Sequence, residues 1–311
     1  MTPTQSPATR IVIAGGGTGG HLFPGLALAE QLSKRGVQVC FVGTSRGIEA
    51  KVVPQSGYPL DLIEVAGLKG QGVLATLRSV VKLPLAMIQT LRLLRRLRPQ
   101  VVVGVGGYAS GPVVLLAALL QIPTVVLEQN SVPGVTNRIL ARFARAVFTS
   151  FPHANHYFPL HKVALLGNPV RQSIAGASSM PIERTGPVRI LVLGGSLGAK
   201  AVNALIIDAI TELCRNTPPA LTPLALHIQL HHQTGQADLE SMQSRYAKLD
   251  EFGRSVHVEP FIGNMAEAYR ECDLMIGRAG ATTLAELTVL ARMTTRSASC
   301  LKTASRRKAT C

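Results

Sequence analysis

Two glycine-rich turns, one in each half of the chain, constrain its fold more than any other feature. The first lies at residues 14–21 and the second at residues 193–199. Each follows a short run rich in β-branched residues and opens a segment with a helical pattern. A strand, a glycine turn and a helix N-terminus together point backbone N–H groups outward, and the helix dipole favours negative charge there. The sequence therefore predicts two α/β domains that face each other across a cleft and hold a phosphorylated substrate.

Strand and helix patterns alternate in both halves, which is typical of βαβ units and a parallel sheet. In the first half, the predicted strands are Ile11–Ala14, Val37–Val42, Leu60–Glu64, Val101–Val105, Thr124–Leu127 and Ala146–Thr149, with helices such as Phe23–Lys34 and Val135–Phe143. In the second half, the predicted elements are Val188–Leu193, Ala201–Leu213, Leu224–Leu230, Ala237–Lys248, Ser255–Val258, Met265–Cys272, Leu274–Ile276 and Thr282–Leu290. The Gly-, Pro- and Ser-rich stretch 167–187 predicts a connection between domains at 1–166 and 188–290.

Composition limits the partners and the cellular compartment. The formal net charge of +15 favours an anionic partner, but 4% aromatic residues and no Trp leave few stacking surfaces for nucleic acid. We therefore expect an anionic membrane surface or a pyrophosphate ligand, and no nucleic acid. The five cysteines include no C-x-x-C pair, which argues against a zinc site or a disulfide framework and indicates a reducing cytoplasm.

The stretch from Val101 to Leu127 carries no charged residue, yet it predicts buried structure and not a transmembrane helix. The segment Gly106–Pro112 interrupts it, and Pro123 interrupts it again, so a buried strand, loop, helix and strand is the better interpretation. The first ten residues contain no apolar signal core, so we expect no secretion signal.

Several common nucleotide-binding sites are disfavoured by the sequence. The G-x-G-x-x-G spacing at Gly15, Gly17 and Gly20 is weak evidence for a dinucleotide site. The second predicted strand ends at residues 41–44 without the acidic residue that would bind a ribose, which argues against a dehydrogenase. The second glycine turn lacks the Gly-Lys-Ser/Thr of a P-loop, and no Asp-x-Asp occurs to hold a metal-bridged diphosphate.

Polar residues gather where the predicted strands end, and α/β sites form at such ends. His21 directly follows the first turn; its imidazole is suited to general base catalysis at neutral pH, and a capping or surface role fits the position equally well. The other polar clusters are Glu128–Asn130 with Thr136 and Asn137, Asn168–Arg171, and Gly277–Thr283 with Glu286. Each cluster alone is explained by loop and capping chemistry, but together with the two turns they indicate a binding site.

The order of these motifs resembles the MurG family of bacterial glycosyltransferases from about Arg10 to Leu290. The segments that carry the resemblance are Gly17–His21 with Pro24-Gly25, Gly106–Pro112, Glu128–Asn130, Gly167–Arg171, Gly194–Ala199 and Arg278–Thr283. One departure is Leu127, where relatives often have His. The resemblance implies the α/β GT-B fold, in which two Rossmann-like domains with parallel sheets face a cleft. It implies an N-terminal domain for a lipid acceptor and a C-terminal domain for UDP-N-acetylglucosamine.

The resemblance also implies the reaction, an inverting transfer of N-acetylglucosamine from UDP-N-acetylglucosamine to lipid I, which is undecaprenyl-pyrophosphoryl-N-acetylmuramyl-pentapeptide. The product is lipid II, a precursor of peptidoglycan. His21 is implied as the catalytic base, with Glu128 near it as a partner or substitute. No cofactor is implied, and no metal at the donor diphosphate.

The residues implied in substrate binding divide between the two domains. In the N-terminal domain they are Thr18, Gly19, Gly20, Tyr108, Asn130 and Asn137, and in the C-terminal domain they are Ser196, Phe261, Ile262, Ala281, Thr282, Thr283 and Glu286. Arg171 lies in the predicted connection between them. The resemblance implies that Ser196 and its turn hold the diphosphate, with Arg171 adding a cation. It implies that Glu286 accepts both ribose hydroxyls and that uracil lies against the backbone near Phe261 and Ile262.

The segment Val73–Pro99 predicts a peripheral position on the cytoplasmic face of the bacterial inner membrane. It combines apolar residues with cations, namely Leu74, Leu77, Val80, Val81, Leu85, Ile88 and Leu91 with Arg78, Lys82, Arg92, Arg95, Arg96 and Arg98. Near an anionic leaflet each cation contributes roughly 1 kcal/mol. An ordinary domain helix that turns its apolar side to the core is the alternative.

The resemblance ends after Leu290. Residues 291–311 carry six cations, no acidic residue and almost no large apolar residue, so they cannot pack a core. We expect an incomplete C-terminal domain caused by truncation or a shifted reading frame, and an impaired enzyme; a basic anchor for an anionic surface is the alternative. Two other functions stay open, another GT-B lipid glycosyltransferase and an inactive nucleotide-binding remnant.

Overall fold

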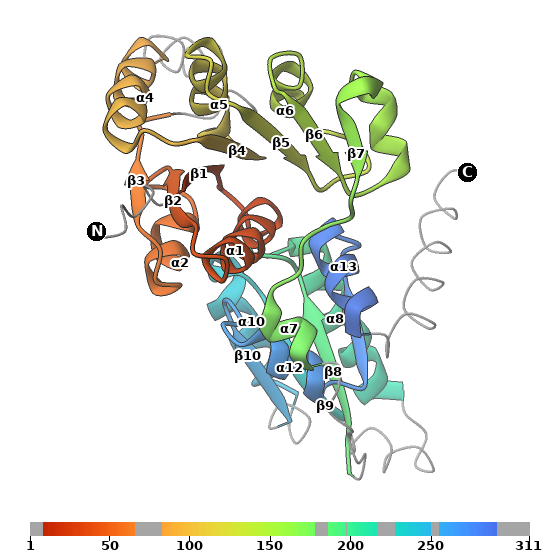
Figure 1. Ribbon diagram of the computed structural model, residues 1–311. Coiled ribbons are helices and arrows are strands. Elements are labelled where there is room, and N and C mark those ends of the chain that lie inside the picture. Colours follow the sequence, from red (N-terminus) through yellow and green to blue (C-terminus); the bar gives the residue numbers. More distant parts are fainter. Residues whose placement is uncertain are drawn as a thin grey trace, which may run out of the picture. The chain divides into compact units, whose positions relative to one another are not determined.

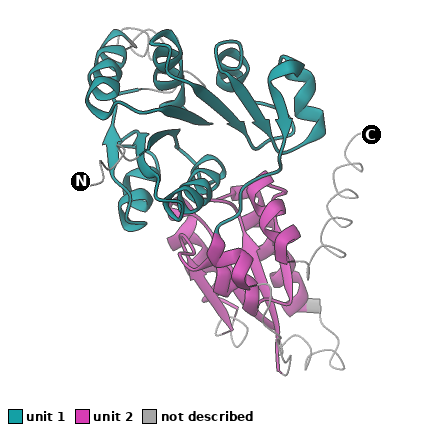
Figure 2. Cartoon of the chain, viewed as in Figure 1, with its two compact units in different colours: residues 1–171 teal, residues 172–311 magenta. Residues whose placement is uncertain are grey.

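The chain divides into two compact units, Met1–Arg171 and Gln172–Cys311, which are called the N-terminal and C-terminal units below (Figure 2). The computed structural model describes residues 9–65, 83–177, 186–196, 198–216, 228–249 and 255–290. Each unit contains one sheet whose paired strands are all parallel. The division falls within the stretch 167–187, where the sequence predicts the connection.

The N-terminal unit is built around a seven-stranded sheet with helices on both faces (Figure 1). Its elements are β1 (Arg10–Gly15), α1 (Gly19–Ser33), β2 (Gln38–Gly43), α2 (Glu49–Gln55), β3 (Leu60–Leu62), α4 (Leu83–Leu97), β4 (Val101–Gly106), α5 (Ser110–Leu119), β5 (Thr124–Glu128), α6 (Val135–Leu140), β6 (Ala146–Thr149), the 3-10 helices η1 (Pro152–Tyr157) and η2 (Leu160–Lys162), and β7 (Val163–Leu165). The strand order is β3-β2-β1-β4-β5-β6-β7. Strands β2 and β3 are added on one side of β1, and β4 to β7 are added on the other, so the switch point lies between β1 and β4. Ligands bind at such switch points in open α/β sheets.

Alternation along the strands creates two cores in this unit. In β1, Val12 and Ala14 pack in the core on the side of α4, α5 and α6, whereas Ile13 packs with α1 and α2 on the other side. Successive side chains of a strand point to opposite faces, so a strand that is buried on both faces is apolar throughout. This explains the charge-free stretch 101–127, which forms β4, α5 and β5 as the sequence predicts.

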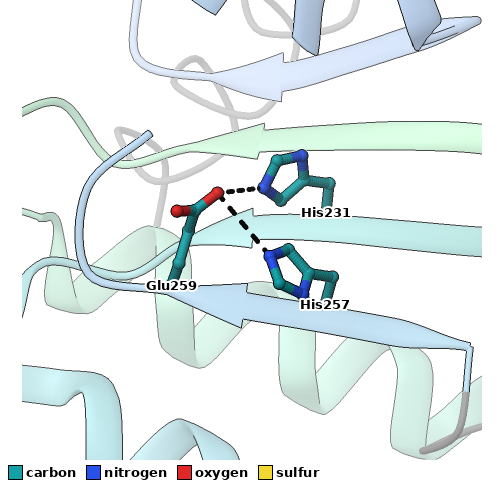
Figure 3. Close-up of side chains that lie close together, drawn as sticks. All are labelled: His231, His257 and Glu259. Carbon is teal, nitrogen blue, oxygen red and sulfur yellow. Dashed lines mark hydrogen bonds and ion pairs between the residues drawn. The ribbon is translucent and has the colours of Figure 1, made fainter. Parts of the chain in front are cut away.

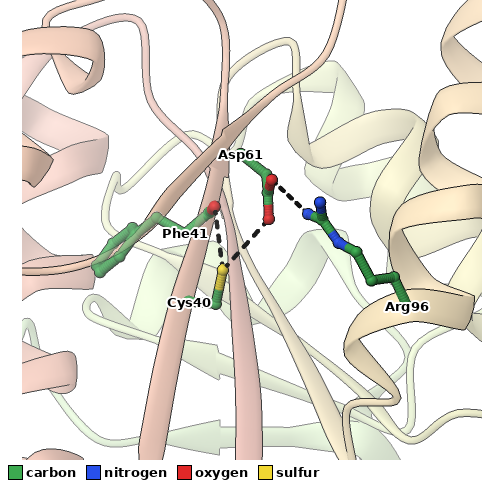
Figure 4. Close-up of polar contacts among 4 residues, drawn as sticks. All are labelled: Cys40, Phe41, Asp61 and Arg96. Atoms are coloured by element: carbon green, nitrogen blue, oxygen red, sulfur yellow. Dashed lines mark hydrogen bonds and ion pairs between the residues drawn. The ribbon is translucent and has the colours of Figure 1, made fainter.

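A hydrogen bond and an ion pair connect strands β2 and β3 to helix α4 (Figure 4). The Cys40 thiol donates to Asp61 Oδ2 at 3.6 Å, and Asp61 Oδ1 pairs with Arg96 Nη2 at 2.5 Å. Burial and the Asp61 carboxylate raise the pKa of the Cys40 thiol to about 11. Cys40 therefore stays a protonated, unreactive thiol at neutral pH.

The C-terminal unit has a four-stranded sheet in the order β10-β9-β8-β11. Its elements are α7 (Gln172–Ala177), β8 (Val188–Leu193), α8 (Lys200–Asn216), β9 (Ile228–Gln233), the 3-10 helix η4 (Gln236–Asp238), α10 (Leu239–Tyr246), β10 (Val256–Glu259), α12 (Met265–Glu271), β11 (Leu274–Gly277) and α13 (Ala281–Leu290). β9 and β10 are added on one side of β8 and β11 is added on the other, so this sheet has its own switch point between β8 and β11. Each unit is therefore Rossmann-like.

Buried polar contacts fasten β9 to its helices. His232 is fully buried, and its two ring nitrogens lie 2.9 Å from Tyr246 Oη and 3.0 Å from Asn203 Oδ1. The Asn203 amide nitrogen donates to the backbone oxygen of Thr234 and to Asp238. Asn203 Oδ1 is therefore the acceptor, and His232 Nε2 carries the proton. Burial lowers the pKa of His232 to about 4, so this imidazole is neutral at pH 7.

Most predicted elements are confirmed, with bounds that differ by a few residues. The strand predicted at 224–230 is β9, which begins at Ile228, and residues 217–227 lie outside the described part of the chain. The structure adds α2, α7, β7 and the 3-10 helices η1 and η2, which the sequence analysis does not predict. Residues 66–82, which include part of the predicted membrane segment, and residues 291–311 also lie outside the description. In the remainder of the chain, no helix is long and apolar enough to cross a membrane.

Candidate functional site

At the carboxyl ends of β1 and β4, the backbones of glycine residues are in close contact. Gly16 N donates to Gly106 O at 3.2 Å. A Cβ atom on Gly15 would lie 2.2 Å from Gly106 O, and one on Gly107 would lie 2.3 Å from Gly16 O. All four residues have φ between 83° and 145°, a region that glycine adopts without strain. Any side chain here would push the two turns apart, so glycine is required for this contact.

His21 stands on the first turn of α1, directly beside this contact. A Cβ on Gly106 would lie 2.7 Å from His21 Nδ1, so the imidazole packs on the β4 backbone. His21 Nδ1 lies 3.1 Å from Gln129 Oε1, while Gln129 Nε2 donates to Val105 O at 3.1 Å. Because the amide nitrogen of Gln129 is used there, its oxygen must accept from Nδ1–H. The tautomer is thereby set, and Nε2 keeps the lone pair that a general base needs.

Glu128, which the sequence analysis places beside His21, has different partners. Its carboxylate is fully buried and accepts four hydrogen bonds. Asn130 donates to Oε1 from both its backbone and its side chain, and Gly134 N and Asn137 Nδ2 donate to Oε2. The hydrogen-bond partner of His21 is therefore Gln129. A carboxylate that satisfies four donors organises the loop from 130 to 137.

The remaining expected residues of the N-terminal unit surround these groups. Thr18 is the N-cap of α1, and its carbonyl accepts from His21 N and Leu22 N. Tyr108 follows β4 and is 47% exposed. Asn137 is buried, and its Oδ1 has no hydrogen-bond partner among the described residues. Such an orphaned acceptor suits a ligand hydroxyl.

Arg171 has a contact that the sequence does not reveal. Its guanidinium lies over the ring of Phe23, with 4.2 Å between Cζ and the ring centroid. Phe23 belongs to α1, two residues after His21. This cation–π contact holds the basic group at the end of the N-terminal unit.

A buried carboxylate, Glu49, lies against the first glycine turn. Glu49 is 1% exposed, and its Oε2 accepts from Gly17 N at 2.7 Å. Its Oε1 accepts from the backbone and hydroxyl of Thr44. A Cβ on Gly16 or Gly47 would lie within 2.5 Å of this carboxylate, so the glycines make room for it. The Gly17 N–H therefore bonds a carboxylate of the chain itself, and a phosphate contact at the rest of this turn stays a prediction.

Replacing Glu49 with glutamine should destabilise the N-terminal unit by about 2–3 kcal/mol, because a charged acceptor of several hydrogen bonds is lost. The glutamine NH2 would also face donors that the carboxylate now satisfies. Urea-induced unfolding measures this change. The matched control is Glu64→Gln, since Glu64 is an exposed carboxylate of the same unit. Equal stabilities of the two variants would contradict the role given to Glu49.

Two helices of the C-terminal unit begin after the carboxyl ends of paired strands. The turn Gly194–Ala199 leads from β8 into α8, and residues 278–280 lead from β11 into α13. β8 and β11 are paired, with Gly277 opposite Leu193 at their carboxyl ends. A Cβ on Gly198 would lie 2.2 Å from Thr234 O, which explains the glycine there. The two helix dipoles favour an anion at this edge.

Gln233 connects the second turn to the segment expected to meet uracil. Its Nε2 donates to Gly195 O at 2.8 Å, and its Oε1 accepts from Ile262 N at 2.9 Å. Gln233 is buried at the carboxyl end of β9. The sequence analysis misses this residue because nothing in the strand pattern distinguishes a buried glutamine from a solvent-facing one. Ser196 and Phe261, the neighbours of the bonded groups, are each half-buried.

The expected sugar-binding residues lie on α13. Ala281, Thr282 and Thr283 form its first turn and are half-buried. Glu286 is 5% exposed, and its Oε2 accepts from Tyr269 Oη at 2.9 Å. Tyr269 comes from α12 and is itself buried, so α12 fixes the carboxylate that is expected to bind the ribose.

Comparisons with known proteins agree with this two-unit architecture. Residues 11–149 match the glycosyltransferase family 28 N-terminal domain, and residues 189–294 match the glycosyltransferase family 28 C-terminal domain. A crystal structure of Acinetobacter baumannii MurG has a TM-score of 0.60 at 34% identity and covers 90% of this chain and 74% of that one. A UDP-GlcNAc 2-epimerase from Neisseria meningitidis, at 11% identity and a TM-score of 0.58, shares the fold alone. The fold is GT-B.

Curated relatives are closer in sequence. A protein of Anaeromyxobacter dehalogenans is 50% identical over 282 residues, which are 90% of this chain and 71% of that protein. A protein of Myxococcus xanthus is 49% identical over 285 residues, with the same coverage. Both are named UDP-N-acetylglucosamine–N-acetylmuramyl-(pentapeptide) pyrophosphoryl-undecaprenol N-acetylglucosamine transferase. This chain belongs to that family of glycosyltransferases.

Proposed function

We propose that this chain transfers N-acetylglucosamine from UDP-N-acetylglucosamine to the muramyl sugar of lipid I, which yields lipid II. The observation that carries the proposal is the 50% identity, over 90% of the chain, to a relative named for this reaction. The N-terminal unit then binds the lipid acceptor and the C-terminal unit binds the donor. His21 and the two helix N-termini of the C-terminal unit are the groups that this chemistry requires.

In the proposed mechanism, His21 Nε2 takes the proton from the acceptor hydroxyl as its oxygen attacks the anomeric carbon of the donor sugar. The bond from that carbon to the diphosphate oxygen breaks, and UDP leaves with the electron pair. A single displacement of this kind inverts the anomeric configuration. Gln129 Oε1 keeps its hydrogen bond to Nδ1–H throughout, so the imidazolium that forms stays oriented.

The charge on the departing UDP is met, in this proposal, by backbone N–H groups at the N-termini of α8 and α13. Both helices point this end to one edge of the sheet, since β8 and β11 are paired and parallel. Glu286 accepts the ribose hydroxyls through the carboxylate that Tyr269 orients. Phe261 and Ile262 present the backbone to uracil, with Gln233 holding Ile262 in place.

Glu128 and Asn137 act as positioning and binding residues. Four donors fix the Glu128 carboxylate, and it in turn holds Asn137 through Nδ2. Asn137 Oδ1 is left to accept a hydroxyl of the acceptor or the donor sugar. Glu128 therefore serves the reaction through the loop and not as a second base.

We further propose that α4 contacts the cytoplasmic face of the inner membrane. Leu85 and Ile88 are 44% and 48% exposed, and Arg92 and Arg95 continue the same stripe at helical spacing. Arg96 is less available, because it pairs with Asp61. Apolar side chains followed by cations on one helix face suit an anionic bilayer surface.

Removing the charges of Arg92 and Arg95 should weaken binding to anionic vesicles about tenfold or more, since each cation contributes roughly 1 kcal/mol near such a surface. Co-sedimentation of R92Q/R95Q with phosphatidylglycerol vesicles measures this. The control is R215Q/K248Q, which removes two exposed cations from the C-terminal unit. Unchanged binding of R92Q/R95Q would contradict the membrane contact at α4.

An acceptor panel tests the proposed function. UDP release from UDP-N-acetylglucosamine is followed with lipid I, with diacylglycerol and without acceptor. The proposal expects release that depends on lipid I. Release with diacylglycerol alone would indicate a different lipid glycosyltransferase, and UDP binding without release would indicate an inactive remnant.

A further inference from the structure

A cluster of two histidines and a glutamate lies on the sheet of the C-terminal unit, and no step of the proposed reaction uses it (Figure 3). His231 belongs to β9, and His257 and Glu259 belong to the edge strand β10. His257 is the register partner of His231, and Glu259 follows two residues later. Side chains two apart on a strand share a face, so this register places all three side chains together.

The ligating atoms of these three residues converge. His231 Nε2 lies 2.5 Å from Glu259 Oε1, and His257 Nε2 lies 3.7 Å from the same oxygen. The three ligating atoms all lie within 4.8 Å of one another. The two imidazole rings are 4.9 Å apart between centroids. Figure 3 shows the carboxylate reaching toward both rings from the end of β10.

These distances suit a small divalent cation after minor side-chain rotation. A zinc ion sits about 2.0–2.2 Å from nitrogen and oxygen ligands, which puts tetrahedral ligand atoms about 3.3 Å apart. The His257–Glu259 distance is close to this value, and the His231–Glu259 distance must lengthen. His257 has the room to adjust, because its side chain is 71% exposed. Two imidazole nitrogens and one carboxylate favour zinc, nickel or copper over magnesium or calcium.

The two residues that follow His231 in β9 agree with this placement of the cluster on one face of the sheet. His232 points to the opposite side, where Tyr246 and Asn203 engage it, so it is not part of the cluster. Gln233 shares the face of His231 and holds Ile262. A cation held by the cluster would therefore clamp edge strand β10 to β9 just before the segment proposed to meet uracil.

We infer that His231, His257 and Glu259 form a binding site for a divalent transition metal, with zinc as the expected ion. The site would stabilise the β9–β10 edge, and it would leave at least one coordination position to water. The lack of a C-x-x-C pair argues against a zinc site ligated by cysteines, whereas all three ligands here are nitrogen or oxygen. His257 and Glu259 lie 26 and 28 residues after His231 along the chain, so sequence spacing does not reveal that the three residues form one site.

The test is titration of tag-free, metal-stripped protein with Zn2+, followed by calorimetry and by the thermal unfolding temperature. We expect one saturable site per chain and a higher unfolding temperature with Zn2+. H257Q and E259Q should each weaken binding by more than the roughly 10- to 100-fold that loss of an outer-shell partner costs. H161Q is the matched control, because His161 is an exposed histidine of η2 in the other unit.

Two results would overturn the inference. One is the absence of saturable Zn2+ binding by the unaltered protein. The other is equal Zn2+ affinity in H257Q, E259Q and H161Q, which would place the metal elsewhere. Circular dichroism of each variant confirms that it folds, and E259Q serves as the second ligand variant if H257Q does not. The readout is metal binding, so the outcome is independent of transfer activity.

Discussion

Replacing His21 with alanine should lower the turnover number about 100- to 10,000-fold, the range that a positioned general base contributes. The affinity for UDP should change little, because His21 belongs to the N-terminal unit, whereas the donor contacts proposed at α8, α13 and Ile262 belong to the C-terminal unit. Single-turnover rates and UDP titration separate the two quantities. A loss of UDP affinity equal to the loss of rate would make His21 a diphosphate contact and would contradict its role as base.

Two further variants sharpen this result. Gln129→Leu removes the acceptor of His21 Nδ1–H and should lower turnover less than H21A, since the imidazole remains. H156Q is the control, because His156 is an exposed histidine of η1 in the same unit. Turnover in H156Q should match the unaltered protein. A Gln129→Leu variant with full activity would show that the tautomer needs no such partner.

Replacing Glu286 with glutamine should have the opposite signature and weaken UDP binding about 10- to 100-fold, since hydrogen bonds to a charged group contribute about 1.5–3 kcal/mol. Turnover at saturating donor should fall much less. The control is Glu240→Gln, because Glu240 is an exposed carboxylate of α10 in the same unit. Tyr269→Phe removes the hydroxyl that orients Glu286 but keeps the carboxylate, so it should weaken UDP binding less than E286Q. Unchanged UDP affinity in E286Q would remove Glu286 from the ribose site.

The strand and helix patterns predicted the fold well because the central strands of both sheets are apolar and buried. Apolar runs such as Val101–Val105 predict buried strands, and glycine turns mark where the strands end. Short elements escaped prediction for the opposite reason. β7 has three residues, all half-buried or exposed, so its pairing with β6 is decided by tertiary contacts.

The sequence predicted site residues only where the residue type itself suggests a catalytic or binding role. His21 stands out beside a glycine turn, and Glu286 stands out on a helix that is otherwise almost entirely apolar or hydroxylic. Glutamine gives no such signal, and the roles of Gln129 and Gln233 emerged from their hydrogen bonds alone. Glu49 lies 32 residues from Gly17 in the sequence, so only the fold shows that it fills the first turn.

The most direct test of the account is the identity of the product formed from lipid I and UDP-N-acetylglucosamine. Mass spectrometry of the extracted lipid, with nuclear magnetic resonance of the released disaccharide, gives its mass and linkage. The account predicts lipid I that has gained one N-acetylhexosamine through a β-1,4 bond, which records inversion of the α-linked donor. Lipid I recovered with unchanged mass, or a product with an α linkage, would contradict it.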